Sequence, residues 1–220
     1  MQARQLAILE AMGVDAYVRR SPAPLPKPAA AGAGSPEWES LAAAVRDCRL
    51  CGLCETRTQT VFGVGNRAAR LMVVGEAPGA EEDRQGEPFV GRAGQLLNAM
   101  LRAAGFERGD VYIANALKCR PPHNRDPSYE ETERCLPYLR RQIELVAPGA
   151  ILCVGRIAAQ RLLGTEQPVG KLRGRVHDLG GVPVVVTYHP AYLLRSPGDK
   201  RKAWDDLKLA LGVLANGHGA

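Results

Sequence analysis

The chain has 220 residues, of which 45% are hydrophobic, and it carries a formal charge of +6 at pH 7. This length and apolar content exclude a disordered chain and suit one well-buried domain. No apolar run approaches the ~20 residues that span a membrane, and the N-terminus lacks a signal-peptide core, so a cytoplasmic protein is expected. The positive charge favours an anionic partner such as nucleic acid, and a mildly basic enzyme without a polymer partner fits it equally well.

The N-terminal part of the chain differs in composition from the rest. Residues 1–20 carry a short helical pattern. Residues 21–36 are rich in Pro, Ala and Gly and have almost no core-forming side chains, as in a linker. A compact domain is therefore predicted over residues 37–214, followed by a short tail over residues 215–220.

From residue 37 onward, short apolar runs alternate with longer amphipathic stretches. The apolar runs predict strands at residues 71–74, 111–114, 150–154 and 183–187. The amphipathic stretches predict helices at residues 37–48, 92–104, 129–146, 156–163 and 199–214. Short apolar strands between helices are typical of a parallel sheet covered on both faces. We therefore expect an α/β fold, a three-layer αβα sandwich around a central, mainly parallel four-stranded sheet.

A long acidic loop follows the first predicted strand. After Val74 the sequence reads GEAPGAEEDRQGEPFVG, with several glycines and carboxylates and one phenylalanine. A purely structural connection between a strand and a helix usually needs only a few residues. Long loops at the carboxyl ends of strands carry the chemistry of α/β proteins. This loop is thus the first candidate site, together with the segments that start at Asn115 and Tyr188.

The cysteines have the spacing of a metal site. Cys48 and Cys51 form a C-x2-C half-site whose flanks are unlike a core pattern, and Cys119 and Cys135 could complete it. In a reducing cytoplasm such cysteines indicate metal rather than disulfides. Four thiolates suit zinc or an iron–sulfur cluster, and the spacing alone does not choose. Cys153 lies in an apolar strand and is expected to be a core residue.

Together these segments resemble the family 4 uracil-DNA glycosylases. The resemblance runs from about residue 37 to residue 214 and leaves residues 1–36 outside. Its motifs are Gly75-Glu76-Ala77-Pro78-Gly79 with Glu82-Asp83, Gly86, Pro88-Phe89-Val90-Gly91 and Gly94, then Asn115 with Lys118-Cys119-Arg120-Pro121-Pro122 and Asn124-Arg125, and finally His189-Pro190 with Leu193-Leu194-Arg195.

The resemblance implies a uracil-DNA glycosylase-like fold and a monofunctional DNA N-glycosylase. Such an enzyme flips uracil out of DNA and hydrolyses its N-glycosidic bond, which leaves an abasic site for base excision repair. The resemblance also implies a [4Fe-4S] cluster on Cys48, Cys51, Cys119 and Cys135. The expected partner is uracil-containing DNA, either single- or double-stranded, and no binding to a membrane is expected. The protein is expected to be a monomer.

The chain departs from the family pattern at one residue and lacks a feature of a related subfamily. Cys54 extends the half-site to C-x2-C-x2-C but is not one of the four usual ligands, so a bystander near the cluster is expected. The related subfamily forms a covalent DNA adduct through an inserted basic loop. Residues 119–127 are too few to hold such an insert, so turnover is expected rather than trapping.

The resemblance also implies roles for the residues around the loop. Phe89 would stack on the extruded base. Asn115 would read the uracil edge, because a carboxamide offers a donor and an acceptor and cytosine presents the reverse pattern. His189 would donate to the charge that develops on uracil O2, an interaction worth on the order of 3 kcal/mol. Glu76 and Glu82 would hold the water or stabilise the cationic sugar.

Further contacts complete the expected site. Backbone amides at Ala77 and Gly79 would line the pocket, because glycine allows close approach. Asn124 and Arg195 would contact the substrate. Phosphate contacts are expected from Lys118, Arg120, Arg125 and Arg195.

Two other classes of protein are compatible with parts of this pattern. A non-catalytic iron–sulfur protein that binds nucleic acid or transfers electrons would carry the cysteines, but it has no need of the combination of Glu76, Glu82, Phe89, Asn115 and His189. A zinc protein would carry the same cysteines without iron. The visible colour of a cluster excludes the zinc protein, and release of uracil excludes the non-catalytic one.

Overall fold

The structure, a computed structural model, describes residues 35–216. Residues 1–34 and 217–220 lie outside this part, and with them the predicted N-terminal helix, most of the linker and the end of the tail. Within residues 35–216, every helix is too short or too polar to cross a membrane.

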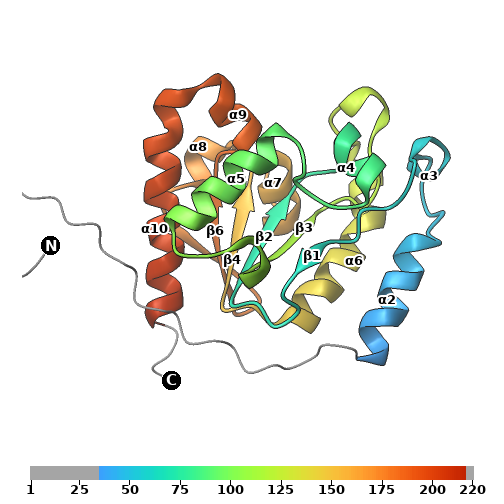
Figure 1. The fold of residues 1–220 in the computed structure, drawn as a ribbon, viewed down its shortest axis with the longest axis horizontal. Helices are drawn as coiled ribbons and strands as arrows, with labels where there is room; N and C mark the ends of the chain where they lie inside the picture. The colour runs from blue at the N-terminus through green and yellow to red at the C-terminus, as the bar shows by residue number, and fades with distance from the viewer. Residues whose placement is uncertain (1–34, 217–220) are drawn as a thin grey trace, which may run out of the picture.

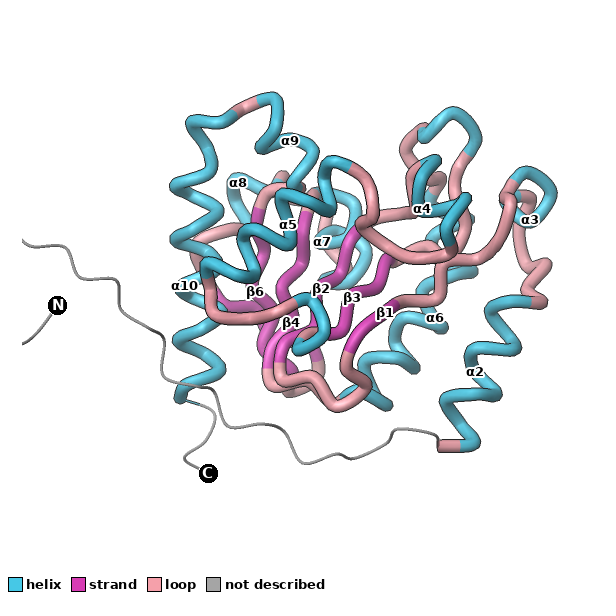
Figure 2. Tube along the Cα trace, in the orientation of Figure 1, coloured by secondary structure: helices cyan, strands magenta, loops and turns pink. Residues whose placement is uncertain are grey.

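The strands of this part of the chain form one sheet of six strands in the order β1-β3-β2-β4-β6-β5 (Figure 2). Their bounds are β1 Val64–Gly65, β2 Leu71–Gly75, β3 Tyr112–Asn115, β4 Ala150–Val154, β5 Val176–Leu179 and β6 Val182–Thr187. The central strands β3, β2, β4 and β6 run parallel, as the sequence predicts. The edge strands β1 and β5 are antiparallel to their neighbours.

The two edge strands are a correction to the predicted four-stranded sheet. β1 has only two residues, too few for a sequence pattern. β5 reads Val-His-Asp-Leu and alternates exposed with half-buried positions, so it lacks the continuous apolar run of the central strands. A continuous apolar run predicts a strand that is buried on both faces, and the half-exposed edge strands of this sheet lack such a run.

Helices cover both faces of the sheet, which makes the fold a three-layer αβα sandwich (Figure 1). Their bounds are α2 Pro36–Arg46, α3 Leu53–Thr56, α4 Ala80–Gln85, α5 Arg92–Ala103, α6 Tyr129–Val146, α7 Arg156–Leu163, α8 Val169–Leu172, α9 Pro190–Arg195 and α10 Lys200–Asn216. One core layer includes α5 and α10, and the other includes α2, α6, α7 and α8.

The alternation of side chains along β2 supplies both core layers. Leu71 and Val73 pack with α5 and α10, whereas Met72 and Val74 pack with α2, α6 and α7. All four are fully buried. The carboxyl ends of β2, β3 and β6 consequently lie at one edge of a sheet that is closed on both faces, and only the loops at this edge can form a pocket.

Most predicted elements agree with the structure to within two residues. The predicted helices at residues 129–146 and 156–163 have the same bounds as α6 and α7. The acidic loop is less extended than its composition indicates, because its middle part forms the short helix α4.

Candidate functional site

A pocket of about 510 Å³ opens at the carboxyl ends of the central strands. All of the residues predicted to be catalytic or substrate-binding lie on its wall. They are Glu76, Ala77, Gly79, Glu82, Phe89, Asn115, Asn124, His189 and Arg195. Arg125, Pro78, Ala93, Pro121 and Ala191 complete the wall. No role was predicted for the two prolines and the two alanines, because small apolar residues carry no chemical signal of a site.

Phe89 forms part of the wall in an unusual backbone conformation. Its φ of 54° lies in the left-handed region, and its side chain is buried. A Cβ on Gly94 would lie 1.7 Å from the Phe89 carbonyl oxygen, so α5 passes too close to the loop for any side chain there. Arg108 donates to the carbonyl oxygens of Pro88 and Phe89 at 2.6 and 3.4 Å. These contacts hold the aromatic ring at the pocket.

Asn115 ends β3 and brings a carboxamide to the same pocket. Its side chain is 2% exposed, and its Oδ1 has no hydrogen-bond partner within residues 35–216. A Cβ on Gly75 would lie 2.4 Å from this oxygen and 2.6 Å from the Phe89 ring, so the glycine makes room for both groups. A buried acceptor without a partner costs about 1–3 kcal/mol. The oxygen is therefore suited to accept a hydrogen bond from a bound molecule.

His189 immediately precedes α9 and acts as its N-cap. Its Nδ1 accepts a hydrogen bond from the Ala191 amide at 3.1 Å, which leaves the proton of a neutral ring on Nε2. Burial, with the charge of Arg195 adding to it, lowers the pKa of His189 to about 4. The ring stacks against Phe89 with 5.7 Å between the ring centroids. At neutral pH the pocket thus contains an uncharged imidazole that can donate from Nε2.

The two predicted carboxylates have different surroundings. Burial raises the pKa of Glu76 to about 7. Glu82 instead accepts backbone hydrogen bonds on both oxygens. Oε1 binds the amides of Val90 and Gly91 at 3.0 and 3.1 Å, and Oε2 binds the amide of Gly79 at 3.2 Å. Glu82 thus ties together the two ends of the loop that carries the aromatic ring.

The acidic neighbours of Glu82 do not line the pocket. Asp83 is buried and accepts from the backbone amides of Thr58 and Gln59, the closest at 3.0 Å. Glu81 is exposed and forms an ion pair with Arg84. Both side chains therefore serve the local structure.

The predicted phosphate contacts differ in accessibility. Lys118 is 1% exposed, so the prediction that it contacts phosphate is wrong. Its position in a polar, proline-rich segment suggests the surface, but the chain turns inward there. Arg125 lines the pocket and is paired with Glu131 at 2.6 Å. Arg120 donates from Nε to Oδ1 of Asn124 at 2.7 Å and so restrains this predicted substrate contact.

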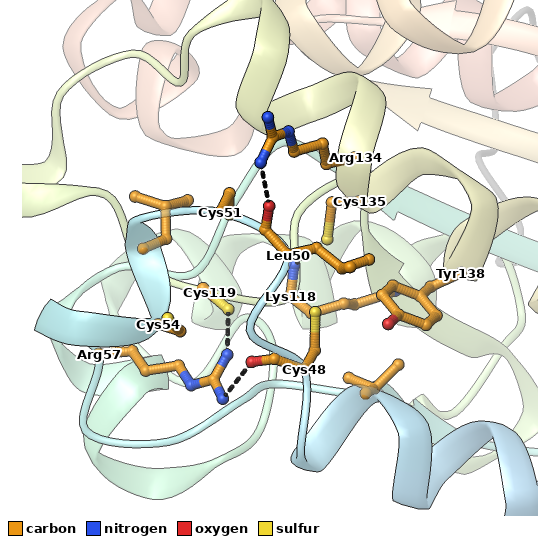
Figure 3. A pocket seen from close by; sticks show the side chains of 12 residues that line it. Cys48, Leu50, Cys51, Cys54, Arg57, Lys118, Cys119, Arg134, Cys135 and Tyr138 are labelled. Atoms are coloured by element: carbon orange, nitrogen blue, oxygen red, sulfur yellow. Dashed lines mark hydrogen bonds between the residues drawn. The ribbon is translucent and has the colours of Figure 1, made fainter.

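The cysteines gather at a second pocket, which lies between the segment of α2 and α3 and the helix α6 (Figure 3). The cysteines lining it are Cys48, Cys51, Cys54, Cys119 and Cys135. All of them are free thiols. The structure thus brings the C-x2-C half-site to the two distant cysteines that could complete it, and it places Cys54 at the same pocket. Cys153 is fully buried in β4, as predicted.

Basic groups contact the sulfur atoms of this pocket. Arg57 donates to Sγ of Cys119 at 3.0 Å and to the carbonyl oxygen of Cys48 at 2.9 Å, and the amide of Lys118 donates to Sγ of Cys135 at 3.2 Å (Figure 3). Burial raises the pKa of Cys135 to about 12, so without a bound cation the sulfur stays a thiol. Sequence reasoning missed Arg57, because an arginine in a polar loop belongs to no periodic pattern.

Four of the cysteines at this pocket are enough to bind a zinc ion or an iron–sulfur cluster. Within residues 35–216, no three His, Cys, Asp or Glu side chains are arranged to hold a single metal ion. Zinc requires all of its ligands at about 2.0–2.3 Å from one ion. In a [4Fe-4S] cluster four cysteines bind a larger body, each on its own iron.

Comparison with known proteins agrees with this architecture. The family model described as "Uracil DNA glycosylase superfamily" matches residues 62–208, which include the whole wall of the large pocket. The match spans more than half of the chain, so the fold and the pocket define a member of this superfamily.

Several curated relatives are more specific. The type-4 uracil-DNA glycosylase of Archaeoglobus fulgidus is 46% identical over 181 residues, which cover 77% of this chain and 91% of that protein. The type-4 enzyme of Thermotoga maritima is 44% identical with the same coverage, and that of Pyrobaculum aerophilum is 43% identical over 76% of this chain and 90% of that protein. The chain belongs to the type-4 uracil-DNA glycosylase family.

Proposed function

We propose that this protein removes uracil from DNA by hydrolysing the N-glycosidic bond, which leaves free uracil and an abasic site in the repair of deaminated cytosine. The observation that carries the proposal is the buried Oδ1 of Asn115, which has no hydrogen-bond partner in the part of the chain that the structure describes, in a pocket that it shares with Phe89 and a neutral His189. The names of the type-4 relatives point to the same base.

Asn115 accounts for the choice of base. Its Oδ1 would accept from uracil N3–H, while its amide nitrogen would donate to uracil O4. Cytosine presents an acceptor at N3 and a donor at N4, so it would leave both carboxamide groups facing like partners. A buried site rejects such a ligand strongly, because its polar groups stay unpaired. Phe89 offers the apolar face on which the extruded base stacks.

His189 accounts for the leaving group. Breaking the glycosidic bond moves negative charge onto the uracil ring, and a preorganised donor stabilises that charge in the transition state. With Nδ1 occupied by the Ala191 amide, Nε2–H is the donor that faces the pocket. Burial keeps the ring neutral, so it donates a hydrogen bond without transferring a proton.

The two carboxylates divide the remaining tasks. Glu76, with its pKa raised to about 7, is partly protonated at neutral pH and is suited to orient the attacking water and to balance the positive charge on the sugar. Glu82 has both oxygens bound to backbone amides, so its contribution is to hold the loop of Phe89 in place. We therefore assign the contact with water to Glu76 first.

DNA binding would depend on the exposed basic residues at the pocket. Arg125 and Arg195 lie on its wall, and Arg120 lies next to it through Asn124. These side chains can neutralise phosphates on either side of the extruded nucleotide. A monomer acting on single- or double-stranded DNA is consistent with one pocket at one edge of the sheet.

We further propose that Cys48, Cys51, Cys119 and Cys135 hold a [4Fe-4S] cluster. The fit rests on thiols from three chain segments at one pocket and on the cationic Arg57 beside the sulfur of Cys119. Bound there, the cluster would supply structural cross-linking between the half-site and α6, with no part in breaking the glycosidic bond. Cys54 would remain a bystander.

A base-release assay tests the proposal. An oligonucleotide with one uracil is incubated with the purified holoprotein, treated with alkali and analysed for strand scission, and free uracil is measured alongside. We expect scission at the uracil only, and a loss of about 100-fold or more for Asn115→Ala and for His189→Ala with DNA affinity unchanged. Binding and a visible cluster without base release would instead support the non-catalytic iron–sulfur protein.

A further inference from the structure

A fully buried lysine lies beneath the base-reading strand. Lys118 is 1% exposed, and its Nζ donates to the carbonyl oxygen of Asn115 at 2.9 Å, to Oε1 of Gln142 at 2.6 Å and to the carbonyl oxygen of Phe62 at 3.3 Å. An ammonium group has three protons, so all are in use. None of these partners is a carboxylate, which is unusual for a buried cation and calls for a reason other than ion pairing.

The same residue also holds the helix that carries a cysteine of the second pocket. The backbone amide of Lys118 donates to Sγ of Cys135, while its side chain binds Gln142 two turns further along α6. Gln142 in turn donates to the carbonyl oxygen of Phe62 at 2.9 Å and to the hydroxyl of Tyr112 at 3.1 Å. Lys118 therefore binds α6 through Cys135 and Gln142 and binds β3 through Asn115.

We propose that Lys118 is a positioning residue for Asn115 and links the base-reading site to the cysteine pocket. Its ammonium fixes the carbonyl oxygen of Asn115, and this sets the direction in which the carboxamide of the same residue enters the pocket. Its backbone amide binds Sγ of Cys135, which lies at the cysteine pocket. Lys118 therefore contacts both the cysteine pocket and Asn115, and a change in the position of Cys135 can alter the position of Asn115. The inference rests on the proposed function, because it assigns Asn115 as the reader of the base.

The local backbone explains why a lysine is needed. After Asn115 the chain leaves the sheet, and the amides of Ala116 and Leu117 bind the carbonyl oxygens of Gly75 and Glu76 at 2.8 and 2.9 Å. The carbonyl of Asn115 is thus the point where the chain turns, and the buried ammonium fixes it. A satisfied buried network holds one arrangement more firmly than apolar packing does.

A double-mutant cycle tests the link. Lys118→Met keeps the approximate shape of the side chain and removes its three donors, and Asn115→Ala removes the base reader. We expect Lys118→Met to slow single-turnover excision of uracil by about 10- to 100-fold with DNA affinity unchanged. In the Asn115→Ala background the same change should cost less than about threefold, because the group that Lys118 positions is already absent. Lys171→Met, at an exposed position in α8, is the matched control and should change nothing.

A readout that does not depend on DNA accompanies the cycle. Hydrogen exchange of the amides of Ala116 and Leu117 should be faster in Lys118→Met than in the control, while the visible absorbance and iron content stay within a factor of two. If Lys118→Met fails to fold, Gln142→Leu, which removes one of the three acceptors of Nζ together with the two bonds that Gln142 donates, should speed the exchange of the same two amides and slow excision to a smaller extent.

The outcomes separate this inference from the proposed function. Equal costs of Lys118→Met with and without Asn115, or unchanged exchange of the two amides, would overturn the positioning role. A wild-type protein that releases no uracil would overturn the proposed function instead, and the exchange measurement would still test whether Lys118 fixes the end of β3.

Discussion

In the base-binding pocket the polar groups are fixed before a ligand arrives, whereas the cysteine pocket holds buried thiols that only the proposed cluster would ionise. Glu82, His189 and the Phe89 loop are each held by hydrogen bonds with backbone groups, and Oδ1 of Asn115 accepts no hydrogen bond from any of residues 35–216. In the cysteine pocket, burial raises the pKa of Cys135 and so favours a neutral thiol.

The difference shows how the two sites divide the work. A pocket that binds and releases many substrates gains from groups already in place, because no reorganisation is needed at each turnover. A site that keeps one bound metal group throughout the life of the protein can be stabilised by that group, because the free energy of binding the group adds to the free energy of folding.

The largest effect is expected from removing a cysteine ligand. Cys135→Ser should abolish the visible absorbance and lower the melting temperature by about 10 °C or more, since loss of a bound metal group is among the costliest single changes. Cys54→Ser is the matched control and should retain both properties. Full iron content in Cys135→Ser, or an equal loss in Cys54→Ser, would show that the ligand set is wrong.

A smaller and purely local effect is expected at Gly75. In Gly75→Ala the new methyl group would lie 2.4 Å from Oδ1 of Asn115, so it would displace the base reader. Single-turnover excision should fall by about 100-fold, while absorbance and melting temperature change little. Gly109→Ala has open space around its Cβ and serves as the control. A normal rate in Gly75→Ala would mean that the carboxamide is less tightly placed than the structure indicates.

The pH dependence of stability should reveal two opposing titrations. Glu76 has a pKa raised from 4.5 to about 7, so its carboxyl binds a proton more tightly in the folded state than in the unfolded state. The contribution of Glu76 to the free energy of unfolding is therefore lost as pH rises toward 7. His189 has a pKa lowered from 6.5 to about 4, so the folded state favours its neutral form. The contribution of His189 to the free energy of unfolding is therefore fully present above pH 6.5 and is lost as pH falls toward 4. The two slopes oppose each other between pH 5 and pH 6.5.

Glu76→Gln should therefore make the free energy of unfolding rise with pH in that interval and exceed the wild-type value at pH 8 by roughly 2–3 kcal/mol. Urea unfolding at half-unit steps of pH measures this, with His189→Gln as the counterpart that should show the opposite slope. Parallel curves for Glu76→Gln and the wild type would mean that Glu76 is ionised as in the unfolded chain.

The smallest effect is expected from a single phosphate contact. Arg195→Gln should reduce the slope of log K against log salt by about 0.7–0.9. Arg125→Gln should reduce it less, because Glu131 already pairs with Arg125. Arg102 lies about 14 Å along α5 from the pocket residue Ala93. Arg102→Gln is therefore the control and should leave the slope unchanged. Equal slopes for Arg195→Gln and the wild type would exclude Arg195 from the DNA contacts.

Features that depend on local patterns and on residue chemistry could be predicted from the amino-acid sequence. α6 was predictable to the residue, because Ser128 and Glu131 form a capping box at its start and a stripe of Leu136, Leu139 and Ile143 faces the core. The edge of the sheet at which the large pocket opens was predictable because the carboxyl ends of parallel strands meet there, and most of its individual residues were expected from the resemblance to the family. The cysteine set was predictable because thiols at this spacing have few other uses.

Only the tertiary structure decided where individual side chains point and what they bind. Lys118 looks like a surface cation in the sequence and is a buried donor in the fold. Glu76 and Glu82 are alike in the sequence, but one is desolvated and the other is bound by backbone amides. Arg57 contacts a cysteine 62 residues away. The physical reason is that burial and hydrogen bonding depend on segments far apart in the chain, whereas helix and strand patterns depend on neighbours.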